Sequence, residues 1–290
     1  LPFDVNTGML FYNEKILTDA GVSAPPTTYE EFLTACEKIA ASGKRPFAMP
    51  TYTNKANSWS SFVNMSWFQR NGANILNTDS TQCTIDSAEC VDTLEKILAL
   101  KEAEYINVTT FEEGEFYAGE VGMMEMGQWN ANKTLSNEDL KIAPLFTIDE
   151  SEEASSTLGM FSLCAINRSA YAANDAEKEQ LMKAEESAKK FIKFLALNEK
   201  SQTEFAKSQF QLPSLKSSLN DSYFQDDPIL SPFAGQISKA VCRPLTPAWT
   251  NIEESLKSLY SAVLTADMDV TEAMTEIKSS IQMELDKFKG

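Results

Sequence analysis

Aromatic, amide and carboxylate side chains gather at four places along this chain. The four stretches are Asp4 to Thr7, Asn57 to Trp59, Gly127 to Asn130 and Pro247 to Asn251. Each of them follows a predicted strand or opens a predicted helix, where ligands collect in open α/β sheets. Aromatic rings can lie against the apolar C–H faces of a pyranose, while amides and carboxylates hydrogen-bond its edge. The mix therefore favours sugar binding, and burial in the core is the competing interpretation for each tryptophan.

Residue patterns typical of catalysis are missing. The sequence contains 0 histidines, which excludes serine–histidine chemistry, and it has no nucleophile elbow, Walker loop, dinucleotide fingerprint or H-E-x-x-H motif. A glycosidase needs only two carboxylates, and 42 acidic residues always offer some pair. These acids fall mainly on predicted helix faces and in loops, such as Glu112–Glu113 and Glu152–Glu153, where solvation explains them. We expect no enzyme, with a glycosidase or lyase as the alternative.

Charge and composition narrow the class of partner. A formal charge of -17 argues against nucleic acid, because phosphate binding needs clustered Lys and Arg. Most of the acidic residues are explained by a solvated surface. The 290 residues, 43% of them hydrophobic, suffice for two lobes with separate cores. No stretch approaches the roughly 18 to 20 apolar residues that a membrane span requires.

The cysteines do not indicate a metal site. Five are present without C-x-x-C spacing and without histidine, so we expect no zinc and no cofactor. Cys36 and Cys164 stand among apolar residues and are predicted to lie in the core. Cys83 and Cys90 flank a short polar segment, so they either close a small disulfide loop or remain free.

Hydrophobic periodicity predicts an α/β fold, in which strands alternate with helices. The predicted strands are 8–12, 120–126, 141–146 and 161–167, and the predicted helices include 32–39, 56–77, 91–98, 184–195, 252–263 and 274–288. Thr28 and Glu31 form a capping box before the first of these helices. The apolar stripe of 184–195 is predicted to pack against a sheet, and the acidic segment 149–156 is the best linker candidate.

Six segments in order resemble one known family, the solute-binding proteins of carbohydrate ABC importers (the maltose-binding-like group). They are Leu1 to Asn13, Pro25 to Phe32, Phe116 to Trp129, Leu158 to Asn167, Ala188 to Leu195 and Gln211 to Pro213. The first and fourth are similar to the family's crossover strands. The second is similar to its PP-x-T-W-x-E-F turn, with Tyr29 where Trp is commoner. In the third, Gly122 stands where alanine is usual.

The resemblance implies a two-lobed periplasmic-binding-protein type II fold, in which sugar binds as the lobes close on hinge strands. It implies a hinge or crossover strand at 1–10, the first part of the C-terminal lobe at 11–156, a returning part of the N-terminal lobe at 157–222, and closing helices at 223–290. The family normally has roughly a hundred residues before this crossover strand, a domain-sized piece. The N-terminal lobe is therefore expected to be incomplete.

The resemblance also implies a set of ligand-binding residues. Trp129 and Trp249 match aromatics that stack on the sugar, and Trp59 lies near a further aromatic contact. Asn6 and Asp4 match polar contacts on the crossover strand, and Gln128 directly precedes Trp129. Gly159 and Met160 match a hinge segment where the backbone approaches the ligand. The implied partners are a carbohydrate and the permease subunits of an ABC transporter. The implied protein is a monomer outside the cytoplasm, either a cell-surface lipoprotein or periplasmic. A sugar-sensing or adhesion module without a transporter is a further alternative.

Overall fold

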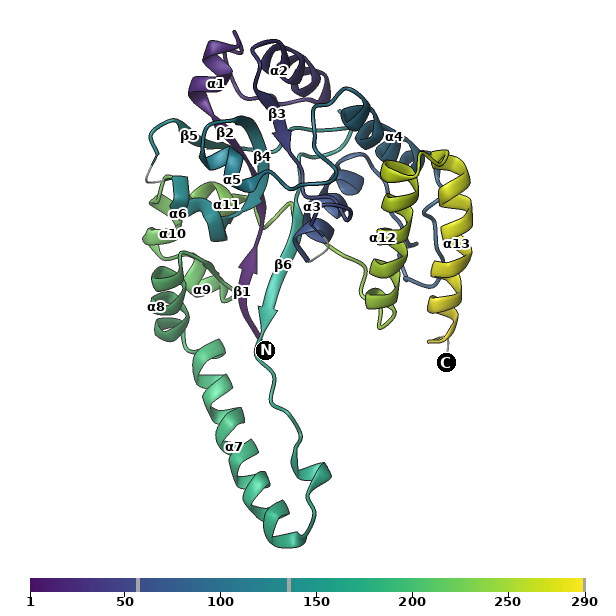
Figure 1. The fold of residues 1–290 in the computed structure, drawn as a ribbon. Coiled ribbons are helices and arrows are strands. Elements are labelled where there is room, and N and C mark those ends of the chain that lie inside the picture. The colour runs from purple at the N-terminus through teal and green to yellow at the C-terminus, as the bar shows by residue number, and fades with distance from the viewer. Residues whose placement is uncertain (56–57, 135–136, 289–290) are drawn as a thin grey trace.

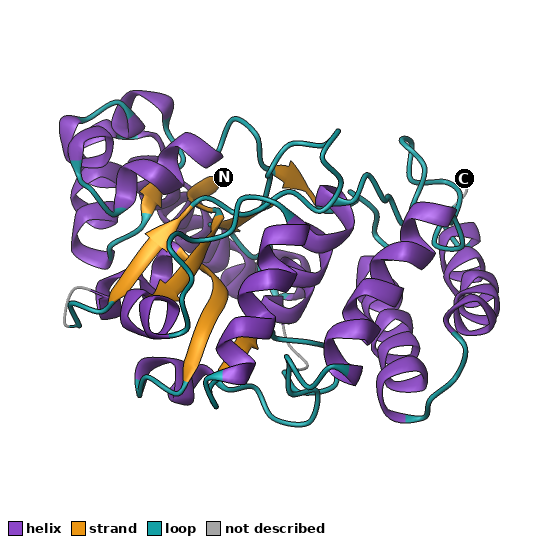
Figure 2. Ribbon diagram, turned by 90° about the horizontal axis from the view of Figure 1, so that it is seen from above, coloured by secondary structure: helices purple, strands orange, loops and turns teal. Residues whose placement is uncertain are grey.

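The computed structural model describes residues 1–55, 58–134 and 137–288. Its strands form two four-stranded sheets, with helices on both sides of them (Figure 2). In Figure 1, α7 projects downward beyond β1 and β6, while α12 and α13 stand side by side on the other side of the molecule. The α/β fold predicted from the sequence is confirmed.

The larger lobe is built on the sheet β3-β4-β2-β5. Its strands are β3 (Arg45–Ala48), β4 (Val121–Gly127), β2 (Gly8–Asn13) and β5 (Leu140–Ala143). β2 runs antiparallel to both β4 and β5, and β3 runs parallel to β4. Every residue of β4 is buried, as expected of a strand with both faces covered.

The second sheet has the order β7-β1-β6-β8, and we call it the hinge sheet because the family resemblance predicts hinge strands here. Its strands are β7 (Leu212–Pro213), β1 (Pro2–Asn6), β6 (Thr157–Ser162) and β8 (Val241–Cys242). β1 and β6 pair antiparallel, with Asn6 opposite Gly159. Only Thr7 separates β1 from β2, so one extended segment passes from the hinge sheet into the larger lobe.

Helices pack on both faces of the larger sheet and, as a further group, beside the hinge sheet. They are α1 (Glu14–Asp19), α2 (Tyr29–Ala41), α3 (Ser58–Arg70), α4 (Ala88–Glu102), α5 (Glu113–Tyr117), α6 (Ala131–Thr134), α7 (Asp175–Leu197), α8 (Glu199–Gln209), α9 (Lys216–Leu219), α10 (Ser222–Asp226), α11 (Leu230–Gln236), α12 (Trp249–Thr265) and α13 (Val270–Asp286), with short 3-10 turns η1 (Gln128–Asn130) and η2 (Ser169–Tyr171). Side chains alternate between the faces of a strand. Leu10 and Met123 accordingly join α2, α3, α4, α12 and α13 in one core, while Phe11 and Met124 join α10 and α11 in the other.

The start of α2 shows half of the predicted capping box. The Thr28 hydroxyl accepts the backbone N–H of Glu31, as predicted. The Glu31 carboxylate, however, accepts from the backbone N–H of Thr27 at 2.8 Å and from its hydroxyl at 2.7 Å, one residue before the expected partner.

Helix α7 forms where the 184–195 stripe predicts a helix, but most of the stripe is exposed in the described chain. Phe191 is 61% exposed, and Phe194 and Leu197 are exposed as well. Among described elements, α7 meets chiefly η2, α8 and β1. The predicted packing against a sheet is therefore limited to the contact with β1 in the described chain, and periodicity shows that a face is apolar without showing what covers it.

Two strands have bounds that differ from the predicted ones, and the burial of one cysteine differs from the prediction. β5 ends at Ala143, before Pro144, and β6 covers 157–162, where β8 pairs with its first two residues and β1 with the other four. Cys36 is buried as predicted, whereas Cys164 is exposed beyond the end of β6, so its assignment to the core is wrong. Cys83 and Cys90 are buried free thiols, so the disulfide alternative is not realised.

Candidate functional site

Four aromatic side chains meet where α3 approaches the end of β4: Trp59, Phe62, Phe111 and Trp129, here called the aromatic cluster. The ring centroids of Trp59 and Trp129 are 6.1 Å apart at 86°, and those of Phe62 and Trp129 are 5.4 Å apart at 74°. Phe111 meets Trp59 at 4.9 Å and 81°. These edge-to-face pairs are the arrangement that ring quadrupoles favour. Both tryptophans remain partly exposed, so they offer apolar surface to a ligand.

Three glycines let the strands approach the aromatic cluster closely. A Cβ atom on Gly127 would lie 1.9 Å from Cζ3 of Trp129, so the indole folds back over bare backbone. A Cβ atom on Gly8 would lie 3.2 Å from the Phe62 ring, and one on Gly159 would lie 3.5 Å from it. Gly159 was predicted to bring backbone close to ligand. In this structure its backbone approaches Phe62, on the hinge side of the cluster.

A cation lies over two rings of the cluster. The ammonium of Lys55 is 5.6 Å from the centroid of Trp59 and 5.4 Å from that of Phe111, within the range of a cation–π contact. Its N–H groups can donate to a ligand bound beside the rings. Sequence reasoning missed both Lys55 and Phe111. The only available signal was that Lys55 lies two residues before the stretch that begins at Asn57.

Gln128 ties the hinge segment to the end of β4. Its side chain is 0% exposed. The Nε2 group donates to the Val5 carbonyl at 2.7 Å and to Oδ1 of Asn6 at 2.9 Å, and Oε1 accepts the Thr7 N–H at 3.2 Å. Every one of these contacts lies within the protein. We therefore propose that Gln128 and Asn6 position the hinge segment, and their contact with a ligand stays a prediction.

Asp4 has a similar position on β1. Its Oδ1 accepts the backbone N–H of Phe161 on β6 at 3.1 Å and the amide of Asn6 at 3.4 Å. Burial raises the pKa of the Asp4 carboxyl, and these two hydrogen bonds oppose that shift only partly. Its contacts join β1 to β6, and they point to a hinge residue.

Trp249 and Met160 lie apart from the aromatic cluster. Trp249, at the start of α12, is 7% exposed and packs in the larger core, with the Arg243 guanidinium 5.3 Å from its ring centroid. Met160 is 49% exposed. It lies opposite Val5 in the register, on the other face of β6 from Gly159, because side chains alternate along a strand. The predicted contact Asn57 lies outside the described residues.

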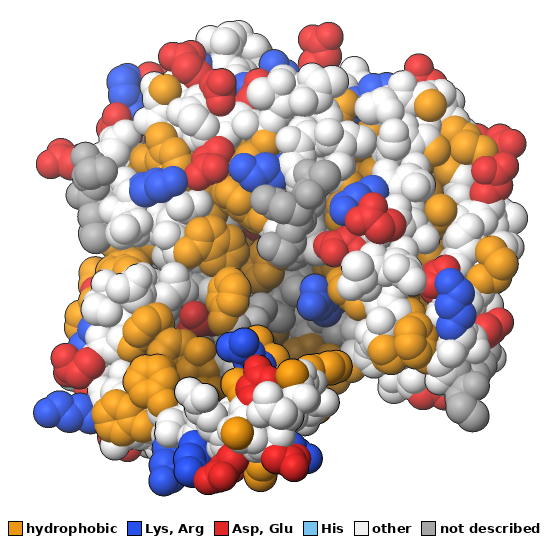
Figure 3. Space-filling model, turned by 60° about the horizontal axis from the view of Figure 1, so that its bottom comes forward, with side chains coloured by type: hydrophobic (Ala, Val, Ile, Leu, Met, Phe, Trp, Pro, Cys, Tyr) orange, Lys and Arg blue, Asp and Glu red, His pale blue; other side chains and the backbone are white. Residues whose placement is uncertain are grey.

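The lower face of the molecule is hollowed near its centre, and hydrophobic side chains gather along the left wall of the hollow (Figure 3). A cavity of about 710 Å³ lies between α3, residues 72–80 and the segment 242–245. Among described residues no group of three His, Cys, Asp or Glu side chains could hold a metal ion. The groups gathered around the aromatic cluster are apolar rings, a cation and buried amides.

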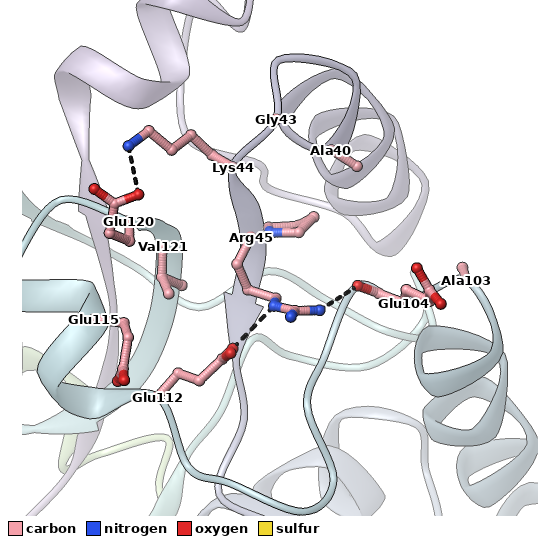
Figure 4. A pocket seen from close by; sticks show the side chains of 11 residues that line it. Ala40, Gly43, Lys44, Arg45, Ala103, Glu104, Glu112, Glu115, Glu120 and Val121 are labelled. Atoms are coloured by element: carbon pink, nitrogen blue, oxygen red, sulfur yellow. Dashed lines mark hydrogen bonds and ion pairs between the residues drawn. The ribbon is translucent and has the colours of Figure 1, made fainter.

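A second cavity, of about 440 Å³, lies at the opposite end of β4 (Figure 4). Four of its charged side chains pair with one another. Lys44 pairs with Glu120 at 2.7 Å, Arg45 pairs with Glu112 at 3.1 Å, and Nη1 of Arg45 donates to the Glu104 carbonyl at 2.9 Å. We assign these contacts to the packing of β3 against α4 and α5.

Several solved structures share the fold of this chain. The cyclic alpha-maltosyl-1,6-maltose binding protein from Arthrobacter globiformis matches with a TM-score of 0.78 at 20% identity, over 99% of this chain and 72% of that one. Maltose-bound MalE3 from T. maritima matches with a TM-score of 0.78 at 22% identity, over 98% and 72%. MalE from Bdellovibrio bacteriovorus, bound to maltotriose, matches with a TM-score of 0.70 at 20% identity, over 99% and 72%.

These likenesses show a two-lobed, maltose-binding-protein-like fold. The 72% coverage of each neighbour agrees with a second lobe that is incomplete in this chain. No curated protein sequence matches this chain. None of the described helices is long and apolar enough to cross a membrane. The sequence profile of the family described as bacterial extracellular solute-binding protein matches residues 1–232. The chain therefore belongs to the family of bacterial extracellular solute-binding proteins.

Proposed function

We propose that this protein binds an oligosaccharide beside the aromatic cluster and delivers it to the permease subunits of an ABC importer, without breaking a bond. The observation that carries the proposal is the pair of partly exposed tryptophan rings, Trp59 and Trp129, next to the hinge sheet. Such rings can stack on the apolar faces of a sugar. Lys55 and polar atoms at the rim can bond its hydroxyl groups.

The first ligand class to test is an α-linked gluco-oligosaccharide. Structurally similar proteins include a cyclic alpha-maltosyl-1,6-maltose binding protein and proteins solved with bound maltose, maltotriose or cycloalternan. These saccharides are all assembled from glucose units with alternating apolar faces and hydroxyl edges. The edge-to-face geometry of the cluster leaves partly exposed ring surface, which suits the apolar face of such a ligand.

The family description places its members outside the cell, so this protein acts extracytoplasmically. Within that compartment we propose a monomer that is either a cell-surface lipoprotein or periplasmic. The division into 1–10, 11–156, 157–222 and 223–290 gives lobes that close around the sugar, and the permease recognises the closed state.

Titration calorimetry tests the proposal with a panel of glucose, tagatose, maltose, maltotriose and cellobiose. We expect saturable heat with at least one α-glucoside at one ligand per chain, and none with cellobiose. Absence of heat with every saccharide would contradict sugar binding. Products appearing during a prolonged incubation would contradict binding without catalysis and favour a glycosidase or lyase.

A further inference from the structure

A buried ion pair joins α3 to β4 close to the hinge. Arg70 and Glu125 have side chains that are 0% and 1% exposed, and Nη2 of Arg70 lies 2.5 Å from Oε2 of Glu125. The guanidinium also lies 4.8 Å from the ring centroid of Phe146. Desolvation of two charges offsets most of their attraction, so a buried pair of this kind is weak as a source of stability. The other hydrogen bonds of Arg70 indicate a second role for the pair.

Arg70 holds the first part of the segment that leads into β6. Its Nη1 donates to the Phe146 carbonyl at 3.0 Å, and its own backbone carbonyl accepts the Asp149 N–H at 3.0 Å. Its Nε donates to the Ser66 carbonyl one turn earlier in α3 at 3.3 Å, which fixes the orientation of the guanidinium. The end of α3 and the 146–149 segment are therefore held by one side chain.

The same turn of α3 reaches the other end of this segment and the hinge sheet. Gln69 accepts the Thr157 hydroxyl at 3.4 Å and donates to the Val241 carbonyl on β8 at 3.3 Å. The Ser156 hydroxyl accepts the N–H of Gly8 at 3.0 Å, which links the segment to β2. β6 and β8 are thus bonded directly to the helix that Arg70 anchors, and β2 is bonded to the segment that leads into β6.

We propose that Arg70 and Glu125 are positioning residues for ligand binding. They fix α3, which carries Trp59 and Phe62, against the two strands that cross between the lobes. The affinity for a saccharide then depends on a pair of side chains that touches no ligand. This inference rests on the proposed function, in which the aromatic cluster binds the sugar.

The double variant Arg70→Met/Glu125→Leu separates positioning from stability. Apolar replacement of a buried pair preserves the fold, so we expect it to melt no more than about 3 °C below wild type. We expect its affinity for maltotriose, measured by calorimetry, to fall about tenfold. Amide hydrogen exchange of residues 149–157 in the ligand-free protein should also become about tenfold faster.

The matched control is Lys44→Met/Glu120→Leu, which removes an exposed pair at the far end of β4 and should change neither affinity nor exchange. If the first double variant does not fold, Arg70→Lys keeps the charge but loses the bond to Phe146, and it should show the same two effects. Unchanged affinity in a folded variant overturns the inference. If wild type binds no saccharide, the proposed function fails, and the exchange of 149–157 alone decides whether the pair holds that segment.

Discussion

Gly127 shows how closely the aromatic cluster depends on a residue that was not among the predicted contacts. Trp129 folds back over the Cα atom of Gly127, at a distance that excludes any Cβ atom. The sequence placed a tryptophan after β4, but it did not show that the preceding glycine sets the orientation of the indole. A ring orientation depends on three-dimensional contact, which residue spacing does not encode.

Gly127→Ala should therefore displace the Trp129 ring. Forcing a methyl group into a filled space costs about 1–3 kcal/mol of unfolding free energy, measured by urea denaturation. Affinity for the saccharide should fall in parallel. Gly235→Ala is the matched control, because a Cβ atom there meets nothing within 4 Å in α11. That control should gain about 0.5–1 kcal/mol. Equal stabilities of the two variants would contradict the packing described.

Trp249→Phe tests whether this tryptophan acts in the core or at the ligand. Its ring is packed in the larger core beneath Arg243. We expect a loss of about 1–3 kcal/mol in unfolding free energy from incomplete filling of the site. Saccharide affinity should remain within about twofold, because the ring is not part of the aromatic cluster. A large loss of affinity with unchanged stability would return Trp249 to the stacking role implied by the family resemblance.

At the scale of elements, the sequence predicted the long helices and the buried strands well. Periodic apolar residues define α4, α12 and α13, and a continuous apolar run defines β4. The two-residue strands β7 and β8 were not predicted, since they exist only through their partners. The hinge network was also missed, because amides that bond buried backbone look the same in a sequence as amides that bond a ligand.

Asp4 makes the hinge sheet sensitive to pH. Burial raises the pKa of its carboxyl above the ordinary value of 3.8, so the folded chain binds this proton more tightly than the unfolded chain. Its contribution to stability is therefore lost as the pH rises from that value through the raised pKa. Asp4→Asn keeps an acceptor for Phe161 and removes the charge, so its stability relative to wild type should increase from pH 3.5 to pH 7, measured by urea denaturation.

Asp79→Asn provides a control of opposite sign. Hydrogen bonds from Thr81 lower the pKa of the Asp79 carboxyl, so the charged form favours folding. The stability of that variant relative to wild type should decrease over the same pH range. If the two variants followed the same trend, the assignment of Asp4 to a desolvated site would be wrong.

At the scale of the whole molecule, the hinge sheet and the aromatic cluster are neighbours. β1 continues into β2, and Gly8 and Gly159 bring both crossing strands against Phe62. A motion of the lobes about the hinge sheet would therefore displace Phe62 and the rings packed against it. The two-lobed fold was predicted from motif order along nearly the whole chain, whereas the position of the site required the side-chain contacts.

Maltotriose titration of wild type and Trp129→Ala, followed by calorimetry, tests the central claim most directly. Tyr171→Ala serves as the control, because that aromatic side chain is 89% exposed and lies in η2. We predict that wild type and the control bind equally, and that Trp129→Ala binds more weakly by about 1–3 kcal/mol, the usual loss when a stacked ring is removed. Equal affinity of all three proteins, or no binding by wild type, would contradict the account.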